Sequence, residues 1–239
     1  MTWLALPARC EVCRAWPARP ICDDCAREAG DPGHGIHHRC ARCALPLTQP
    51  LAVSAPQDPA LCVACRLRPA PLDACACALP YDFPWDGLIG RLKFGGEPGL
   101  AGPLAALLRA CPAVGQLLSA ADWVVPLPLA PGRLAERGYN QALELARRLA
   151  PRRQLAPRLL RRVRETPPQT SLDRAARVRN LRQAFEVDPA QAATIQGRRL
   201  LLVDDVMTSG ATLHEAARVL RAAGAAHVAA VVLARTNLP

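Results

Sequence analysis

The chain has 239 residues, of which 51% are hydrophobic and 21% charged, and it carries a net charge of +10. Its longest strongly apolar stretches, near Leu200–Val203 and Val228–Ala234, are much shorter than the roughly 20 residues of a membrane span, and the N-terminus lacks the apolar run of a signal peptide. We therefore expect a soluble, cytoplasmic protein with no membrane span, long enough for one ordinary domain and a small one.

Residues 1–70 are rich in cysteine and proline and show little hydrophobic periodicity, so they cannot build a core unaided. Eight of the eleven cysteines form four CxxC pairs: Cys10/Cys13, Cys22/Cys25, Cys40/Cys43 and Cys62/Cys65. Because two such pairs make one tetrahedral four-thiolate site, this spacing predicts two structural Zn²⁺ ions that supply folding energy. Sequential pairing would give two zinc ribbons in tandem, and interleaved pairing would give a cross-brace module. Redox disulfides are the weaker alternative.

Six further cysteine and histidine residues could compete for the metal. They are Cys75, Cys77, Cys111, His34 and the pair His37/His38. Since the four CxxC pairs already fill two sites, we expect the three remaining cysteines to be dispensable for metal and the histidines to lie in exposed loops.

Residues 71–239 alternate between strand and helix patterns. Tyr81–Gly96 is typical of a strand end followed by a helix that Asp86 caps, and residues 98–111 predict a second, amphipathic helix. Trp123–Leu127 predicts a strand that leads into a loop rich in proline, glycine and arginine.

The middle of this region continues the alternation. Asn140 can cap a helix that Pro151 closes, and residues 156–163 predict another strand. Residues 164–185 are typical of a polar, proline-containing loop that runs into an arginine-rich helix.

The last segment predicts a βαβ unit. A continuous apolar strand ends on Asp204 and Asp205, a helix covers Thr212–Ala223 and stops at Gly224, and a second apolar strand follows. Continuous apolar strands are typical of a parallel sheet that is covered on both faces. We therefore expect an α/β domain with a mainly parallel sheet flanked by helices over residues 71–239, preceded by a small zinc-ribbon domain over residues 1–70.

The stretch VDDVMTSGAT (residues 203–212) places two carboxylates and several hydroxyl groups where a parallel strand ends and a helix begins. Ligands bind beyond the carboxyl ends of such strands. Adjacent carboxylates can accept hydrogen bonds from the neighbouring hydroxyls of a sugar or hold Mg²⁺ through water. The first amides of a helix attract phosphate, and glycine lets the backbone approach it. These residues predict a site for a sugar phosphate: Asp204, Asp205, Thr208, Ser209, Gly210, Ala211 and Thr212.

This arrangement closely resembles the phosphoribosyl pyrophosphate (PRPP) motif of type I phosphoribosyltransferases. Together with Val124–Ala142, Leu159–Phe185 and the tandem CxxC motifs, it is similar to the ComF family, phosphoribosyltransferase-like proteins linked to DNA uptake in competent bacteria. The resemblance extends from Cys10 to Ala234. It departs from the family only mildly, with Ser209 where a second threonine is common and Tyr139 where phenylalanine is common.

The resemblance implies a PRPP site with Mg²⁺ and a separate pyrophosphate subsite. In the type I fold that subsite lies in a loop after an early strand of the sheet, here residues 127–138, where Arg133 and Arg137 are the natural anion ligands. Residues 164–172 match the flexible loop that closes over the site. Arg161, Arg162, Arg164 and Gln169 could then reach the pyrophosphate, and we expect Arg164 to be catalytic together with Asp204 and Asp205. His214 is expected to be a surface or packing residue.

The basic charge is concentrated between Pro131 and Arg182, which contains fourteen arginines and only four acidic residues. One pyrophosphate can use only a few of them. The excess predicts a second anion surface, which includes Arg174 and Arg177 and tracks the backbone of single-stranded DNA. A solvated arginine-rich surface is the alternative.

Three functions are compatible with these features. The first is Mg²⁺-dependent phosphoribosyl transfer with release of pyrophosphate, in a protein that acts with other DNA-uptake proteins. The second is a non-catalytic protein that senses PRPP and handles single-stranded DNA. The third is a zinc-ribbon transcription regulator with a degenerate transferase domain. The complete diol and phosphate motif favours the first, whereas no segment is recognisable as a base-reading hood, so the acceptor stays open.

Overall fold

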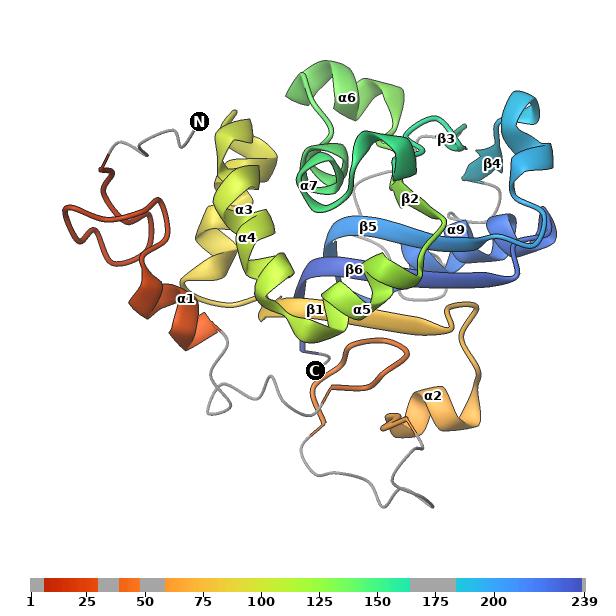
Figure 1. The fold of residues 1–239 in the computed structure, drawn as a ribbon, viewed down its shortest axis with the longest axis horizontal. Helices are drawn as coiled ribbons and strands as arrows, with labels where there is room; N and C mark the ends of the chain where they lie inside the picture. Colours follow the sequence, from red (N-terminus) through yellow and green to blue (C-terminus); the bar gives the residue numbers. More distant parts are fainter. Residues whose placement is uncertain (1–6, 30–38, 48–58, 164–183, 238–239) are drawn as a thin grey trace.

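The structure, a computed structural model, describes residues 7–29, 39–47, 59–163 and 184–237 (Figure 1). Its helices are α1 (Asp23–Ala29), α2 (Val63–Leu67), α3 (Trp85–Phe94), α4 (Ala101–Ala110), α5 (Pro112–Ala120), α6 (Pro131–Arg137), α7 (Gln141–Leu149) and α9 (Ala211–Ala222). Short 3₁₀ helices are η2 (Pro98–Leu100), η3 (Arg152–Gln154) and η5 (Pro189–Thr194). The strands are β1 (Ala74–Pro80), β2 (Trp123–Pro126), β3 (Leu160–Arg162), β4 (Phe185–Val187), β5 (Arg199–Met207) and β6 (His227–Arg235).

The main sheet has four strands in the order β1-β6-β5-β2, and every neighbouring pair is parallel. This confirms the predicted α/β class. The strand predicted over residues 156–163 is real but shorter, and it lies outside this sheet: β3 pairs antiparallel with β4 in a separate two-stranded ribbon. The arginine-rich helix predicted near residues 174–182 lies outside the described residues.

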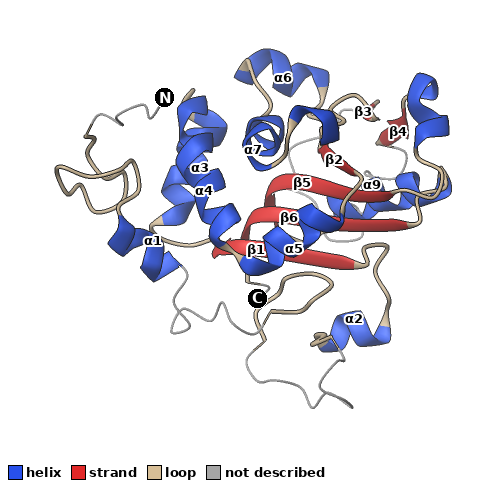
Figure 2. Cartoon of the chain, viewed as in Figure 1, coloured by secondary structure: helices blue, strands red, loops and turns tan. Residues whose placement is uncertain are grey.

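Helices cover both faces of the sheet (Figure 2). On one face, Leu201 and Val203 of β5 share a buried core with α3, α4, α5 and α7. On the other face, Leu200 and Leu202 pack with α9 and the β3–β4 ribbon. The cysteine-rich region contributes to both cores, because Cys10 and Cys25 join the first and Cys40, Cys43, Cys62 and Cys65 join the second.

Several helix ends follow the predicted signals. The side chain of Asn140 accepts hydrogen bonds from the amides of Ala142 and Leu143, so it caps α7 as expected. Beyond α9, Gly224 has φ +99°, a left-handed conformation that suits glycine at a helix end.

Three predicted boundaries were wrong. Asp86 does not cap α3, because it lies inside the first turn, and the carbonyl of Asp82 accepts from the amides that open this helix. Residues 131–137 form helix α6 rather than a loop, since a proline starts the helix and Gly138, at φ +78°, ends it. Strand β5 does not end at the aspartates but continues to Met207.

No single helix of the described residues is both long and apolar enough to cross a membrane. A bent pair, Pro98–Ala110 with Pro112–Ala120, meets that test by length and composition only. In the fold, both helices of this pair contact the main sheet.

Candidate functional site

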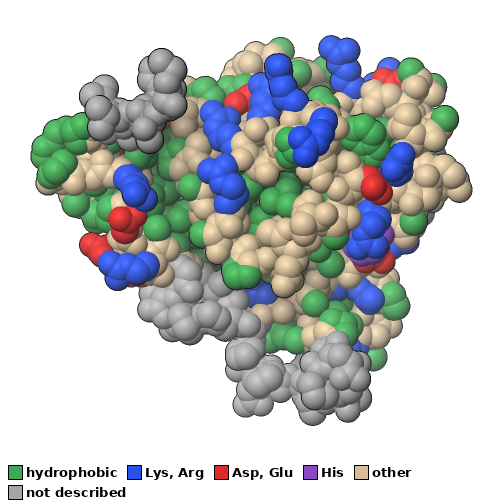
Figure 3. All heavy atoms as spheres, in the orientation of Figure 1, with side chains coloured by type: hydrophobic (Ala, Val, Ile, Leu, Met, Phe, Trp, Pro, Cys, Tyr) green, Lys and Arg blue, Asp and Glu red, His purple; other side chains and the backbone are tan. Residues whose placement is uncertain are grey.

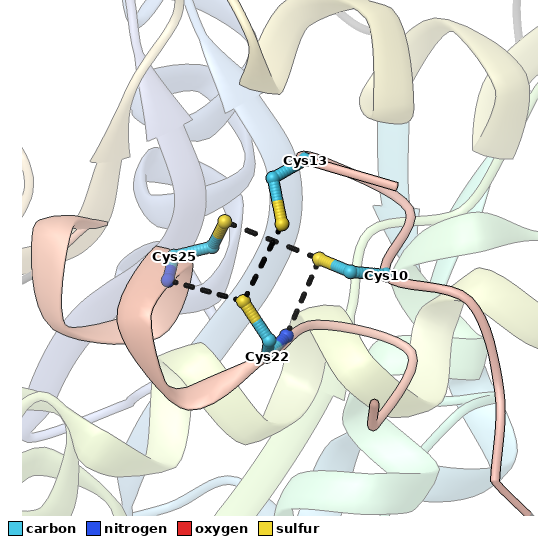
Figure 4. A group of neighbouring side chains, drawn as sticks. All are labelled: Cys10, Cys13, Cys22 and Cys25. Atoms are coloured by element: carbon cyan, nitrogen blue, oxygen red, sulfur yellow. Dashed lines mark hydrogen bonds between the residues drawn. The ribbon is translucent and has the colours of Figure 1, made fainter. Parts of the chain in front are cut away.

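The eight cysteines of the CxxC pairs form two clusters, and each cluster contains two consecutive pairs. One holds Cys10, Cys13, Cys22 and Cys25 (Figure 4), and the other holds Cys40, Cys43, Cys62 and Cys65. Within each cluster all four sulfur atoms lie within 4.8 Å of one another. The sequential pairing is therefore confirmed over the interleaved one.

The sulfur positions fit a tetrahedral metal ion. Zn–S bonds of about 2.3 Å in a tetrahedron place the sulfurs about 3.8 Å apart. The Sγ–Sγ distances are 3.9 Å for Cys10/Cys25, 3.7 Å for Cys13/Cys22 and 3.7 Å for Cys43/Cys62. None of these distances is a disulfide bond, and all eight cysteines are free thiols. The donor set of four thiolates is consistent with zinc.

The four thiols of the second cluster affect one another's ionisation. A hydrogen bond from Cys43 lowers the pKa of Cys40 to about 4, and the same interaction raises the pKa of Cys43. Burial and the charge of Cys40 raise the pKa of Cys65 to about 12. One thiolate thus keeps its neighbours protonated, and four thiolates can coexist only around a positive ion.

The remaining cysteines are placed apart from both clusters. Cys75 and Cys77 are buried on β1, where the Cys77 thiol donates to the Leu79 carbonyl at 3.0 Å. Cys111 separates α4 from α5. They belong to neither metal-ligand group, as expected.

Asp204 and Asp205 lie near the carboxyl end of β5 and have different surroundings. Successive side chains of a strand point in opposite directions. Asp205 is 3% exposed, and one of its carboxylate oxygens lies 3.1 Å from the Nζ of Lys93 on α3. The other oxygen is buried and has no hydrogen-bond partner among the described residues. An acceptor in this state is available to a donor or cation that binds at the strand end.

Asp204 is less buried than Asp205 and is affected by several charges. Burial raises its pKa to about 7, and the charge of Asp205 acts in the same direction. Lys93 and Arg162 partly oppose this rise. The pair thus carries a proton near neutral pH that an added cation would displace.

Lys93 is a site residue that sequence reasoning missed. It is the only lysine of the chain, and its place near the end of a helix predicted on other grounds gave no hint that it would meet Asp205, 112 positions later. The one hint in the sequence was that a single lysine occurs among 30 lysine and arginine residues.

The turn between β5 and α9 requires glycine at one position. Gly210 has φ +78°, and a Cβ atom there would lie 2.4 Å from Cε of Met207 and 3.2 Å from Cε1 of His214. The first amides of α9 have no partners inside the helix. Of these, Ala211 donates to the hydroxyl of Ser209 at 3.4 Å. Thr208 is exposed, and Ser209 and Thr212 are partly exposed, so three hydroxyls surround this turn.

Arg137, at the end of α6, lies against the same helix end as Lys93. Its guanidinium carbon is 5.1 Å from the ring centre of Phe94, which follows Lys93. Tyr139, two residues after Arg137, also holds α3 at this place, because its hydroxyl donates to the carbonyl of Leu92 at 2.5 Å. Arg133 lies one helical turn before Arg137. The predicted pyrophosphate ligands are therefore carried by a helix docked beside Lys93.

The residues expected to close over the site are only partly described. Arg162, on β3, is one of the charges that act on Asp204. Arg161 instead pairs with Glu186 at 3.4 Å, on the neighbouring strand β4. Arg164 and Gln169 lie outside the described residues.

His214, one turn into α9, is partly buried. Burial lowers its pKa, and its Nε2 has no hydrogen-bond partner among the described residues. Its ring lies against the turn at Gly210, which agrees with the expected packing role.

Comparison with known proteins identifies the domain family to which the residues of this site belong. Residues 135–237 match the phosphoribosyl transferase domain family. The chain is 33% identical to the DNA utilization protein YhgH of Salmonella typhimurium, over 98% of this chain and 99% of that protein. It belongs to the ComF family. It is also 35% identical to competence protein F of Haemophilus influenzae, over 65% of this chain and 69% of that protein.

A further relative matches a shorter part of the chain. An adenine phosphoribosyltransferase of Mycobacterium avium is 47% identical over 45 residues, which are 19% of this chain and 25% of that protein. This ComF-family chain thus combines a phosphoribosyl transferase domain with two four-cysteine clusters.

Proposed function

We propose that the chain binds PRPP with Mg²⁺ at the end of β5 and transfers its phosphoribosyl group with release of pyrophosphate. The observation that carries the proposal is the buried Asp205 oxygen, which has no hydrogen-bond partner in the described part of the chain and lies beside Asp204 and next to the turn at Gly210. A carboxylate pair of this kind fits the oxygen preference of Mg²⁺. The matching phosphoribosyl transferase domain supports the same assignment.

In this proposal the chain's own residues divide the work. Asp204 and Asp205 accept hydrogen bonds from the ribose hydroxyls, and the amides and hydroxyls of residues 208–212 hold the 5′-phosphate. Arg133 and Arg137 bind the pyrophosphate. Arg164, which lies outside the described residues, reaches the pyrophosphate as a catalytic residue. Bound Mg²⁺ would neutralise charge that develops on the leaving group. The arginines fix the leaving group in line with the departing bond.

The double variant Asp204→Asn, Asp205→Asn tests the site. Each charged hydrogen bond lost costs about 1.5–3 kcal/mol, so PRPP affinity should fall at least about a hundredfold. Titration calorimetry with PRPP and Mg²⁺ measures this, and Asp86→Asn, which changes an exposed carboxylate on α3, is the matched control. Wild-type affinity in the double variant, or no binding by the wild-type chain, would refute the proposal.

Pyrophosphate release from PRPP then separates transfer from sensing. The acceptors to be screened are nucleobases, amines and single-stranded DNA. Release with one of them supports the enzyme, whereas binding without release supports a non-catalytic PRPP sensor.

A second candidate function is the handling of single-stranded DNA, together with other DNA-uptake proteins. It is favoured by the names of the relatives, which refer to DNA utilization and competence, and by the basic segment Pro131–Arg182. Lys and Arg side chains gather over the part of the surface in Figure 3 where α6 and α7 lie, with few acidic groups among them. Arg152 and Arg153 of η3 add to the exposed charge.

This candidate predicts binding that ignores sequence and weakens with salt. Each phosphate neutralised should contribute about 0.7 log units of affinity per log unit of salt. Changing Arg174, Arg177 and Arg179 to alanine, all outside the described residues, should flatten that slope and leave PRPP binding nearly intact. No binding at low salt, measured by fluorescence anisotropy, would leave the arginine-rich surface merely solvated.

A further inference from the structure

Arg235, the last residue of β6, is a buried cation between the second cysteine cluster and the turn at the end of β5. It is only 2% exposed. Its Nε donates to the carbonyl of Cys43 at 3.1 Å, and its Nη1 donates to the carbonyls of Met207 at 3.0 Å and Thr208 at 2.5 Å. One guanidinium thus holds a metal-ligand residue and the start of the predicted phosphate turn.

The hydrogen bonds of Arg235 do not compensate its charge. Its other acceptors are the carbonyl and hydroxyl of Thr236, and among the described residues none of its acceptors is a carboxylate. A buried charge with only neutral partners is costly.

Two more arginines surround the same cluster. Arg39 donates to the carbonyl of Ala44 at 2.9 Å, and Arg42 donates to the carbonyl of Cys65 at 3.3 Å. Buried nitrogens of both side chains have no acceptor among the described residues. A divalent ion with four thiolates carries a formal charge of about −2, which these guanidinium groups would offset.

The first cluster offers an internal contrast. It lies against the other face of the sheet. The arginines near it have carboxylate partners: Arg91 pairs with Glu11 at 2.7 Å and with Glu97 at 2.5 Å. Cys13 of this cluster is exposed, whereas all four cysteines of the second cluster are buried. The charge of Arg91 is therefore balanced by carboxylates and does not depend on the first cluster.

We propose that Arg235 is a positioning residue that couples metal occupancy of the second cysteine cluster to the conformation of the turn at residues 207–212. With metal bound, the anionic cluster keeps the guanidinium in place, and the guanidinium holds the carbonyls of Met207 and Thr208. The coupling itself needs no PRPP. Its effect on ligand affinity rests on the proposed function.

Hydrogen–deuterium exchange of the turn in the full-length holoprotein tests the coupling without any ligand. Cys62→Ser with Cys65→Ser removes ligands from the second cluster, and Cys22→Ser with Cys25→Ser is the matched control at the first. Each variant should lose one zinc. Only the former should speed exchange of the amides of His214 and Thr236, which donate to the turn carbonyls of Gly210 and Met207 at 2.9 and 3.2 Å, by about tenfold or more, because local opening follows local stability. Equal exchange in the two variants would overturn the proposal.

Variants of Arg235 provide the second arm and decide the question if a cysteine variant fails to fold. Arg235→Gln should speed exchange of the same amides and release of the second zinc to a chelator, since residues behind a metal ligand typically change metal affinity by about 10–100-fold. Arg235→Lys, which keeps the charge, should restore zinc retention in large part. Unchanged exchange in folded Arg235→Gln, or lysine and glutamine variants that behave alike, would overturn the coupling.

PRPP calorimetry on the same proteins keeps the two proposals separate. If the wild-type chain binds PRPP, Arg235→Gln should weaken binding by about tenfold or more, as expected for a residue that orients a binding group. If the wild-type chain does not bind PRPP, the proposed function fails, while the exchange data still decide the coupling.

Discussion

Replacing Asp204 by asparagine should stabilise the protein at alkaline pH. The ordinary pKa of 3.8 rises to about 7 in the fold. Between these values the folded state holds a proton that the unfolded state has released, so the free energy of unfolding falls as pH rises from about 4 to 7. At about 1.4 kcal/mol per pKa unit, the ionised carboxylate lowers the free energy of unfolding by up to about 4 kcal/mol above pH 7. Because Asp205 shares the proton, we expect a loss of about 2–4 kcal/mol.

Urea unfolding of wild type and Asp204→Asn at pH 5 and pH 8 measures this cost. The two proteins should have similar stability near pH 4, and the advantage of the variant should grow toward pH 8. The lowered pKa values of His214 and His227 make stability rise with pH, but they act equally in both proteins and cancel in the difference. Asp86→Asn should follow the wild-type curve. The reasoning would be refuted if the stability of the variant relative to wild type did not increase between pH 5 and pH 8.

Two further predictions concern the metal sites and the turn. Elemental analysis of reduced protein should find about two zinc ions per chain, and Ser at Cys75, Cys77 or Cys111 should not change that content; one zinc per chain would contradict the tandem assignment. Gly210→Ala should destabilise by about 1–3 kcal/mol and abolish PRPP binding, because φ is +78° and the added Cβ meets Met207 at 2.4 Å. Gly138→Ala is the control, because Gly138 has the same φ of +78° but nothing within 4 Å of an added Cβ. Thermal melts of the two variants therefore isolate the effect of the contact with Met207. Equal losses of stability in both variants would exclude such an effect.

Local signals in the sequence were enough for much of the fold. The apolar runs predicted β5 and β6, the cap at Asn140 predicted α7, and CxxC spacing predicted both clusters. Segments with weaker local signals were missed. Strand β1, ACACALP, contains alanine and cysteine in place of branched residues, and α6 starts with proline and glycine, which are equally typical of a loop. The division of the chain at residue 70 stays a prediction.

The candidate site divides in the same way. The turn chemistry around Gly210 could be inferred because all its parts are neighbours in the sequence. Lys93 and Arg235 could not, because each reaches its partners only after the sheet has formed: Arg235 contacts Cys43 across 192 positions. A strand read in isolation also gives no reason to treat a final arginine as buried, since arginine usually ends a strand in solvent.

The different surroundings of the two cysteine clusters argue that they have different effects on the site. Both have the same four donors and nearly the same sulfur spacing, so their metal chemistry should be alike. What differs is the balance of charge around them. Near the first cluster, Arg91 is paired with Glu11 and Glu97, and the cluster can lose its ion without leaving this cation unpaired. Around the second, none of the described acceptors of Arg235 is a carboxylate, and in our proposal the metal-bound cluster supplies its counter-charge. The other carbonyls that Arg235 holds belong to the turn where we propose that phosphate binds.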